Sequence, residues 1–219
     1  MNSEFNDMHK ANCSLIEVGP LKVVRVSQLL PKHERESLYD AVCHEQEAFK
    51  TLNFPGSIDG MTKYLKFESN GEVGTNAILT HKAYKVLCNR IIDQLPALFE
   101  MLDIEPFDIS NVPLTFNNSS HGHFGNPHVD SVNGQYQISL LYYFHGLPKK
   151  FRGGDLEFYS HDDGSPKGYS HDPIIKIDFE DNLLIAFVSE TFHGVTEVLS
   201  DSDEFGDGRF VAVGFLGSE

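Results

Sequence analysis

The chain has no tryptophan, only three cysteines and few basic residues among its 219 residues. Cys13, Cys43 and Cys88 are odd in number and far apart, which favours a reducing cytoplasm over a disulfide framework. Lysine and arginine together number 17 against 32 aspartates and glutamates, so the formal net charge is −15. This imbalance argues against nucleic acid and anionic membranes as partners.

Long apolar segments are also missing. No apolar run approaches the roughly 20 residues that cross a bilayer as a helix, and no amino-terminal stretch has the pattern of a signal peptide. An apolar fraction of 40%, with 17 phenylalanines and 8 tyrosines, is nevertheless typical of a globular protein. The length predicts one compact domain with a substantial core.

The first part of the chain mixes irregular stretches with one short strand and one helix. Residues 1–19 are polar and patternless, so we expect a loose tail or the lead-in to a strand. Residues 20–110 are expected to form a helical support and a substrate loop. Within them, Leu21–Val26 is a β-branched run that predicts a strand, and Pro31 is well placed to open a helix.

A glycine-rich stretch and a second helical pattern follow. Residues 52–78 have few apolar side chains, which predicts a long loop with a short strand around Tyr64–Phe67. From Thr80, which we expect to cap a helix, apolar residues recur every three or four positions as far as Leu102. Pro96 is expected to break or kink that helix.

After about residue 110 the apolar residues alternate, which is typical of strands. Clusters of Gly, Asp, Ser and Pro separate eight candidate strands, at 112–117, around His128, and at 136–144, 154–159, 173–179, 183–188, 193–198 and 209–215. Because no helical pattern interrupts them, an antiparallel sandwich or barrel is favoured over a parallel sheet.

Two potential metal ligands, His128 and Asp130, lie two residues apart on an extended segment, so their side chains point to one face. His193 follows the apolar strand 183–188 and supplies a third ligand. Two histidines and one carboxylate form the facial set that suits Fe(II) and leaves coordination positions open. A structural zinc site would be closed by four protein ligands.

Arg209 opens the last apolar strand, on the same face as two valines. A buried cation without a partner is very costly, and a guanidinium grips a carboxylate through two parallel hydrogen bonds. We therefore expect an acidic co-substrate to enter the barrel. On the strand 136–144, alternation groups Tyr143 with Gln137, Ser139 and Leu141. Tyr143 is either a second hydrogen-bond donor to that ligand or an ordinary core tyrosine.

Three other patterns allow different interpretations. The run His161-Asp162-Asp163 repeats the spacing of the first pair, but it lies in a Gly/Pro/Ser-rich loop and is expected to be a solvated turn. His121 and His123 could serve a cupin-like metal site, although no matching carboxylate motif follows them. The acidic loop Asp201–Asp207 suggests calcium, but Phe205 occupies a ligand position, so we expect a solvated hairpin loop.

Five motifs, in this order, resemble the prolyl-hydroxylase type of Fe(II)/2-oxoglutarate oxygenase. They cover roughly residues 111–217 and are His128-Val129-Asp130, Ile138-Ser139-Leu140-Leu141-Tyr142-Tyr143-Phe144, Phe151-Arg152-Gly153-Gly154-Asp155-Leu156, His193-Gly194-Val195 and Arg209-Phe210. The resemblance implies a mainly β (α+β) fold. Residues 111–217 would form a double-stranded β-helix core of the jelly-roll or cupin-like kind, with N-terminal supporting helices.

The resemblance also implies roles for individual residues. His128, Asp130 and His193 would bind the iron and form the catalytic centre, Arg209 would bind the distal carboxylate of 2-oxoglutarate, and Tyr143 would assist it. The implied cofactors are Fe(II), 2-oxoglutarate as co-substrate and O₂, with ascorbate as an optional addition. Because halogenating relatives lack the carboxylate ligand, Asp130 indicates hydroxylation of an unactivated C–H bond, with release of succinate and CO₂.

The sequence departs from the family pattern at two places. The segment from His193 to Arg209 is longer than in many members, and near Asn118, where animal oxygen-sensing relatives carry a tyrosine, this chain has none.

The resemblance suggests proline, a prolyl residue or another amino-acid-derived molecule as substrate, free or peptidyl, chosen by the loop 52–78. The alternatives are a cupin-like protein that binds a metal or an acidic ligand without turnover, and a metal-dependent isomerase that needs no 2-oxoglutarate. Between Asp155 and Asp207 the chain has 14 carboxylates and only two lysines. Such loops favour a neutral or cationic substrate, with plain solubility as the competing explanation. The oligomeric state is not readable from the sequence.

Overall fold

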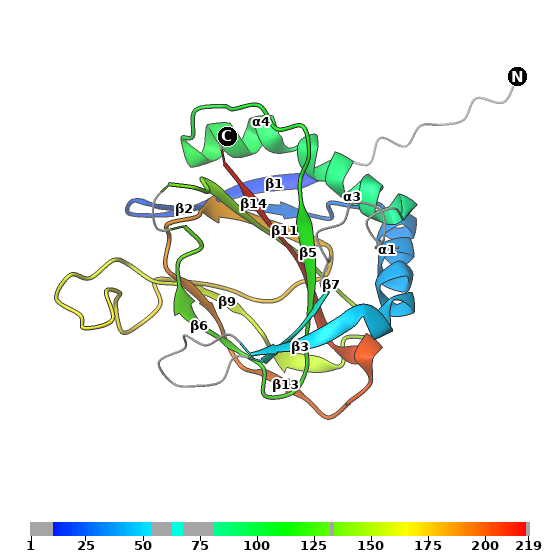
Figure 1. Cartoon of the computed structure of the whole chain (residues 1–219). Helices are drawn as coiled ribbons and strands as arrows, with labels where there is room; N and C mark the ends of the chain where they lie inside the picture. Colours follow the sequence, from blue (N-terminus) through cyan, green and yellow to red (C-terminus); the bar gives the residue numbers. More distant parts are fainter. Residues whose placement is uncertain (1–10, 54–62, 68–80, 132–133, 218–219) are drawn as a thin grey trace, which may run out of the picture.

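The structure is a computed structural model that describes residues 11–53, 63–67, 81–131 and 134–217. Two antiparallel β-sheets face one another, and helices pack on the outer face of the larger sheet (Figure 1). The larger sheet has eight strands in the order β1 (Asn12–Val18), β2 (Leu21–Ser27), β11 (Leu183–Val188), β7 (Ile138–His145), β14 (Arg209–Leu216), β5 (Leu114–Ser119), β4 (Lys63–Phe67) and β3 (Phe49–Asn53).

The smaller sheet completes the barrel. It has four strands in the order β10 (Ile175–Ile177), β9 (Leu156–Phe158), β12 (His193–Val195) and β6 (Gly125–His128). A separate pair joins β8 (Phe151–Gly153) to β13 (Val198–Ser200). The four strands β11, β7, β14 and β5 face the four of the smaller sheet, which is the predicted double-stranded β-helix.

The predicted strands from residue 112 onward are confirmed, with shifted ends and one subdivision. Strand 183–188 is found as predicted. The predicted strand 193–198 covers all of β12 and only the first residue of β13, because the chain leaves the smaller sheet after Val195 and pairs with β8 instead. β8 itself was not predicted as a strand of its own. It is three residues long and ends at Gly153, too short to show alternation.

Three helices follow the predicted pattern closely. α1 (Lys32–His44) begins directly after Pro31, as expected. The second helical pattern is broken into α3 (Lys82–Ile92) and α4 (Leu95–Leu102), and Pro96 lies in the first turn of α4. The predicted cap Thr80 is wrong, because the residue before α3 is His81, whose Nδ1 accepts a hydrogen bond from the Ala83 backbone N–H. None of the described helices is long and apolar enough to cross a membrane.

Two further predictions concern segments at the edges of the described residues. Residues 12–18 of the expected tail or strand lead-in form the edge strand β1, whose side chains are mostly exposed on both faces, so no alternation marks it. The short strand expected near 64–67 is β4. The loop prediction is wrong at residues 52–53, which end the strand β3. The rest of the predicted loop, 54–62 and 68–78, lies outside the described residues. Short 3₁₀ turns occur at Gln46–Ala48 and Phe205–Asp207.

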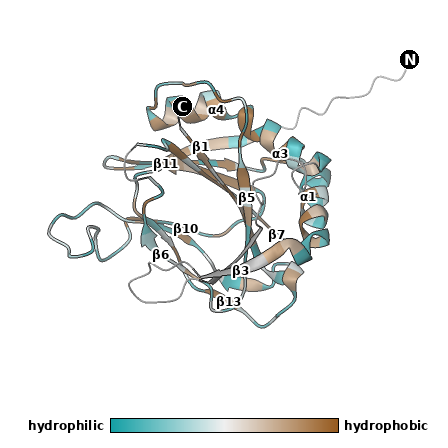
Figure 2. Ribbon diagram, in the orientation of Figure 1, coloured by the Kyte–Doolittle hydropathy of each residue, from teal (hydrophilic) through white to brown (hydrophobic). Residues whose placement is uncertain are grey.

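The large sheet separates two apolar cores. On its outer face, Leu140, Tyr142 and Phe144 of β7 pack with the inward side chains of the helices. On its inner face, Leu141 and Tyr143 pack with side chains of the smaller sheet inside the barrel. Every residue of β7 is therefore buried, which explains its nearly continuous apolar sequence. Figure 2 shows these hydrophobic strands at the centre and hydrophilic residues along much of α1 and the protruding loop.

Candidate active site

His128, Asp130 and His193 lie together at one end of the barrel. Their ligand atoms are all within 4.8 Å of one another, and they form the one such group of His, Cys, Asp or Glu among the described residues. His128 Nε2 is 3.5 Å from Asp130 Oδ1, and His193 Nε2 is 3.5 Å from Asp130 Oδ2. The register of the smaller sheet places His193 directly opposite His128. The three residues, 65 positions apart at most in the sequence, are brought together as predicted.

Backbone carbonyls hold both imidazoles in one tautomer. His128 Nδ1 lies 2.8 Å from the Asn126 carbonyl oxygen, and His193 Nδ1 lies 3.0 Å from that of Thr191. A carbonyl oxygen can only accept, so each Nδ1 carries the proton and donates it. The Nε2 lone pairs are therefore left for a metal, which is the usual arrangement of histidine ligands.

Burial and mutual contact set the protonation of the three groups. Burial lowers the pKa of His193 to about 4, so its imidazole is neutral at pH 7. Burial alone would raise the pKa of Asp130, but His128, His193 and the Ser139 hydroxyl lower it, so the carboxylate is ionised. Burial opposes a charge on His128, yet the hydrogen bonds with Asp130 and the Asn126 carbonyl raise its pKa. Two imidazole nitrogens and one carboxylate are a donor set that fits a divalent iron ion.

The group is open on the side of His128. The His128 side chain is 49% exposed, whereas those of Asp130 and His193 are 9% and 5% exposed. Phe187 packs edge-on against His193 from inside the barrel, with ring centroids 4.7 Å apart. Among the three candidate ligands, His128 is therefore the one most accessible to a molecule from solvent.

Two buried serines support Asp130, a contact that the sequence analysis did not identify. The Ser139 hydroxyl donates to Asp130 Oδ2 at 2.6 Å and is hydrogen-bonded to the Ser189 hydroxyl at 2.9 Å. Both serines are fully buried. The signal in the sequence is a single serine within the otherwise apolar and aromatic strand 138–144, because a buried hydroxyl needs a partner.

Arg209 lies further along the barrel interior and is only 2% exposed. Its guanidinium carbon is 4.9 Å from the ring centroids of both Tyr143 and Phe179, and its Nε donates to the Gly154 carbonyl at 2.7 Å. The exposed Lys149, which the sequence analysis did not identify, lies at the edge of this interior, with its Nζ 5.3 Å from the Phe179 ring centroid. Partial desolvation lowers the pKa of Lys149; the charge of Asp155 opposes this shift, and that of Arg209 adds to it.

Polar atoms of two further side chains face this interior. Asn117 Oδ1 is buried without a hydrogen-bond partner among the described residues, and the buried Tyr143 hydroxyl lies beside Arg209. Tyr143 and Asn117 both pair with Val211 in the sheet register, so all three side chains are on the barrel-interior face. Burial raises the pKa of Tyr143 to about 12 although Arg209 opposes it, so the hydroxyl keeps its proton and can donate. This interior therefore fits a polar, anionic ligand beside Arg209.

Asn118, the position of the missing tyrosine, faces the other way. It pairs with Phe210 on the helix side of the sheet, and its Nδ2 donates to the Phe205 carbonyl at 2.9 Å. The Phe205 ring packs against Phe49 and Phe210, with centroids 4.9 and 5.3 Å away. The expectation that 201–207 is a solvated hairpin loop is therefore wrong at Phe205, because an apolar ring is fixed where the acidic sequence suggested only solvent.

The other histidine patterns do not gather at a metal site within the described residues. His121 Nδ1 accepts from the Ser200 backbone N–H and His123 Nδ1 from that of Ser120, so both fix local backbone. His161 and Asp163 are exposed, with side chains 68% and 95% accessible, as expected for a solvated turn.

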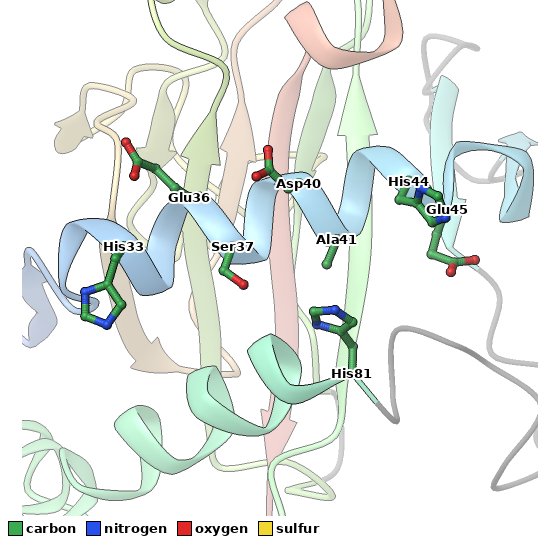
Figure 3. A pocket seen from close by; sticks show the side chains of 8 residues that line it. All are labelled: His33, Glu36, Ser37, Asp40, Ala41, His44, Glu45 and His81. Atoms are coloured by element: carbon green, nitrogen blue, oxygen red, sulfur yellow. The ribbon is translucent and has the colours of Figure 1, made fainter.

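A hollow of about 540 Å³ lies on the far side of the large sheet, against α1. Figure 3 shows that its lining comes from α1, the residue that follows it and the start of α3, namely His33, Glu36, Ser37, Asp40, Ala41, His44, Glu45 and His81. Although three histidines and three acidic residues line the hollow, they do not bring three ligand atoms together. Among the described residues, three ligand atoms thus converge in the barrel and not in this hollow.

Comparison with known proteins finds a matching family model and one curated relative. Residues 114–217 match the model of the 2OG-Fe(II) oxygenase superfamily. An uncharacterized PKHD-type hydroxylase of Synechocystis is 24% identical over 238 aligned positions, which cover 95% of this chain and 78% of that protein.

Solved structures show the same fold at low sequence identity. A prolyl-4-hydroxylase of Pseudomonas putida is 17% identical with a TM-score of 0.58, covering 90% of this chain and 92% of that one. A prolyl hydroxylase of Trichoplax adhaerens, solved with a peptide of the hypoxia inducible factor oxygen degradation domain, is 12% identical with a TM-score of 0.57. That match covers 89% of this chain and 83% of the other.

Proposed function

From the premise that residues 114–217 belong to the 2OG-Fe(II) oxygenase superfamily, we propose that this iron- and 2-oxoglutarate-dependent dioxygenase hydroxylates an unactivated C–H bond. The substrate would be proline, a prolyl residue or another amino-acid-derived molecule. One atom of O₂ enters the substrate as a hydroxyl group, and the other enters succinate as 2-oxoglutarate loses CO₂. The names of the similar proteins, which include prolyl hydroxylases and a PKHD-type hydroxylase, support this choice of substrate.

His128, Asp130 and His193 would hold the iron, because their donor atoms already converge. Bound Fe(II) supplies the one-electron and O₂ chemistry that side chains lack. The residues themselves contribute two imidazole nitrogens and one carboxylate, held by the Asn126 and Thr191 carbonyls and the Ser139 hydroxyl.

Arg209 and Tyr143 would hold the distal carboxylate of 2-oxoglutarate. The guanidinium offers paired donors to a carboxylate, and the protonated Tyr143 hydroxyl offers one more. Burial of both groups removes competing water and strengthens these contacts.

One observation carries the proposal: the candidate metal ligand Asp130 and the buried Arg209 contact the same face of one strand. Ser139, which touches Asp130, and Tyr143, which touches Arg209, are four residues apart on the interior face of β7. Four residues of extended strand span about 13 Å. Apolar side chains such as Leu141 line the interval. A slender molecule with a polar group at each end, such as a five-carbon dicarboxylate, suits that interval.

Two further assignments belong to this proposal. The three cysteines are all free, which supports a reducing, cytoplasmic setting. The division of the chain at residue 110 and the choice of substrate by the loop 52–78 stay predictions.

The test is anaerobic addition of Fe(II) and 2-oxoglutarate, followed by a screen for succinate release over free amino acids, prolyl peptides and biosynthetic intermediates. We expect a visible metal-to-ligand charge-transfer band that disappears in His193→Ala, and succinate release that depends on one substrate class.

In Arg209→Ala we expect a much higher 2-oxoglutarate requirement while iron binding survives. The matched control is Arg152→Ala, which removes an exposed arginine. A wild-type protein that binds metal and ligand but never releases succinate would instead be a cupin-like binding protein.

A further inference from the structure

Asp130 is the one iron ligand of the proposed site whose side chain is held by other side chains. The two histidines are fixed by backbone carbonyls, which belong to their own segments. The Asp130 carboxylate is instead fixed from β7 by Ser139, whose hydroxyl lies 2.6 Å from Oδ2. The orientation of the carboxylate therefore depends on Ser139, which lies outside the His128-Val129-Asp130 motif, nine positions further along the chain.

The direction of this hydrogen-bond chain follows from proton counting. A serine hydroxyl carries one proton, and the ionised Asp130 can only accept. The Ser139 proton therefore points to Asp130, and the contact of 2.9 Å between the two serine oxygens requires Ser189 to donate to Ser139. Donation from Ser189 polarises the Ser139 hydroxyl and strengthens its bond to the carboxylate.

Ser189 also fixes the backbone on which Asp130 is carried. Its carbonyl accepts from the backbone N–H groups of Asp130 and Ser131, at 2.9 and 3.2 Å. Its own N–H donates to the Gln137 carbonyl at 3.1 Å, just before β7. Both serines are fully buried, so water does not compete for these bonds. The carboxylate is thus placed before any metal arrives, with Oδ1 toward His128 and Oδ2 toward His193.

We propose that Ser139, oriented by Ser189, is a positioning residue for Asp130 and sets the affinity of the site for its divalent metal. The inference rests on the proposed function, because it takes Asp130 as a metal ligand. Without the Ser139 hydroxyl, the carboxylate can rotate away from the two imidazoles, and the metal must order it on binding. Partners that orient metal ligands are typically worth about 10- to 100-fold in metal affinity.

The test is anaerobic titration with Co(II), followed through the visible absorption bands of the bound ion and without any turnover. We expect Ser139→Ala to weaken Co(II) binding by about 10- to 100-fold, and Ser139→Thr, which keeps a hydroxyl, to stay within about threefold of wild type. Ser189→Ala should weaken binding less than Ser139→Ala, since it removes only the polarising donor.

Tyr142→Phe is the matched control. It removes another fully buried hydroxyl from β7, one that donates to Asn182 Oδ1 at 2.9 Å on the opposite face of the sheet. We expect it to lower the melting temperature and leave Co(II) affinity unchanged. A general loss of barrel packing would weaken Co(II) binding in Tyr142→Phe as well, and that result would overturn the positioning role.

The outcomes separate this inference from the proposed function. Wild-type protein that binds Co(II), while Ser139→Ala and Ser189→Ala bind it equally well, overturns the positioning role and leaves the function intact. Failure of Ser139→Thr to restore affinity also overturns it. Should Ser139→Ala not fold by circular dichroism, Ser189→Ala alone decides in the same way. Wild-type protein that binds no Co(II) overturns the proposed function and the inference together.

Discussion

Gly154 lies directly beneath the side chain of Arg209. A Cβ atom built at Gly154 would stand 2.5 Å from Arg209 Cδ and 2.8 Å from Nε, and the residue has a φ of +70°. Its carbonyl accepts the Arg209 Nε–H at 2.7 Å. The absence of a side chain therefore lets backbone and guanidinium approach each other, so the Gly153-Gly154 motif is more than a turn.

At the residue scale we predict that Gly154→Ala weakens 2-oxoglutarate binding by at least about tenfold and leaves Co(II) binding intact. The added methyl group would displace the guanidinium, whereas the metal ligands lie at the other end of the interior. Isothermal titration with 2-oxoglutarate, with Co(II) already bound, measures the effect. A positive φ alone costs roughly 1–2 kcal/mol of stability for a residue with a Cβ.

Gly19→Ala is the control for that backbone cost. Gly19 has a φ of +59° and nothing within 4 Å of its Cβ position. We expect Gly19→Ala to lower stability in a similar way and to leave 2-oxoglutarate affinity unchanged. Equal 2-oxoglutarate affinity in Gly154→Ala and wild type would remove Gly154 from the Arg209 site.

At the scale of elements, the acidic segment before β14 is anchored by one ring. Phe205 packs against Phe49 and Phe210, the Tyr39 hydroxyl donates to the Gly206 carbonyl at 2.9 Å, and Asn118 holds the Phe205 carbonyl. These contacts join the segment to α1, β3 and β5. Because Arg209 follows only two residues after Asp207, they also fix where β14 begins.

We predict that Phe205→Ala lowers the free energy of unfolding by about 2 kcal/mol, somewhat less than a fully buried phenylalanine would cost. Leu199→Ala is the control, since Leu199 is 40% exposed and should change stability by less than about 0.5 kcal/mol. Urea unfolding followed by circular dichroism measures both. Equal stability of the two variants would mean that the segment is held by solvent-exposed contacts alone.

Elements with a strong period were predictable from the sequence, and contacts between elements were not. The apolar run 183–188 and the break at Pro96 were readable because each follows from local preference. The short strand β8 and the ring of Phe205 depend on what the rest of the fold places beside them. The cap His81 is a local contact with Ala83, but histidine is not among the preferred capping residues, so Thr80 was chosen instead.

The candidate site, too, has features that the sequence predicts and contacts that only the fold creates. His128, Asp130, His193 and Arg209 could be proposed because their spacing and order resemble a family, and the fold brings the first three together. Ser139, Lys149 and Gly154 were missed, since a serine in a strand, a lysine before a turn and a paired glycine have ordinary local explanations. Only the register of β7 against β14 puts Tyr143 beside Val211 and aligns the interior face.

At the scale of the whole molecule, the excess of acid lies outside the site. The proposed centre, with Fe(II), Asp130, the 2-oxoglutarate dianion and Arg209, is formally neutral. Most of the 14 carboxylates between Asp155 and Asp207 are exposed, including Asp162, Asp163 and Asp172 on the protruding loop. Most of the acidic excess of this segment therefore lies on the surface.

Such a surface repels itself, and the repulsion should lower stability at neutral pH. We predict that the melting temperature at pH 7.5 rises by a few degrees as NaCl is raised from about 0.02 to 0.5 M, because salt shortens the range of repulsion to a few ångströms. Near pH 5.0, the isoelectric point expected from the sequence, the net charge vanishes and the same salt step should change the melting temperature little. Differential scanning calorimetry at the two pH values measures both.

A salt effect of equal size at pH 5.0 and pH 7.5 would contradict electrostatic repulsion, because a general action of salt on apolar burial does not depend on net charge. If salt raises the melting temperature only at neutral pH, the excess of acidic residues lowers the stability of the protein. Solubility, or attraction of a cationic substrate by the acidic loops, must then account for it. Substrate affinity that falls as salt rises would favour attraction, since screening weakens only interactions between charges.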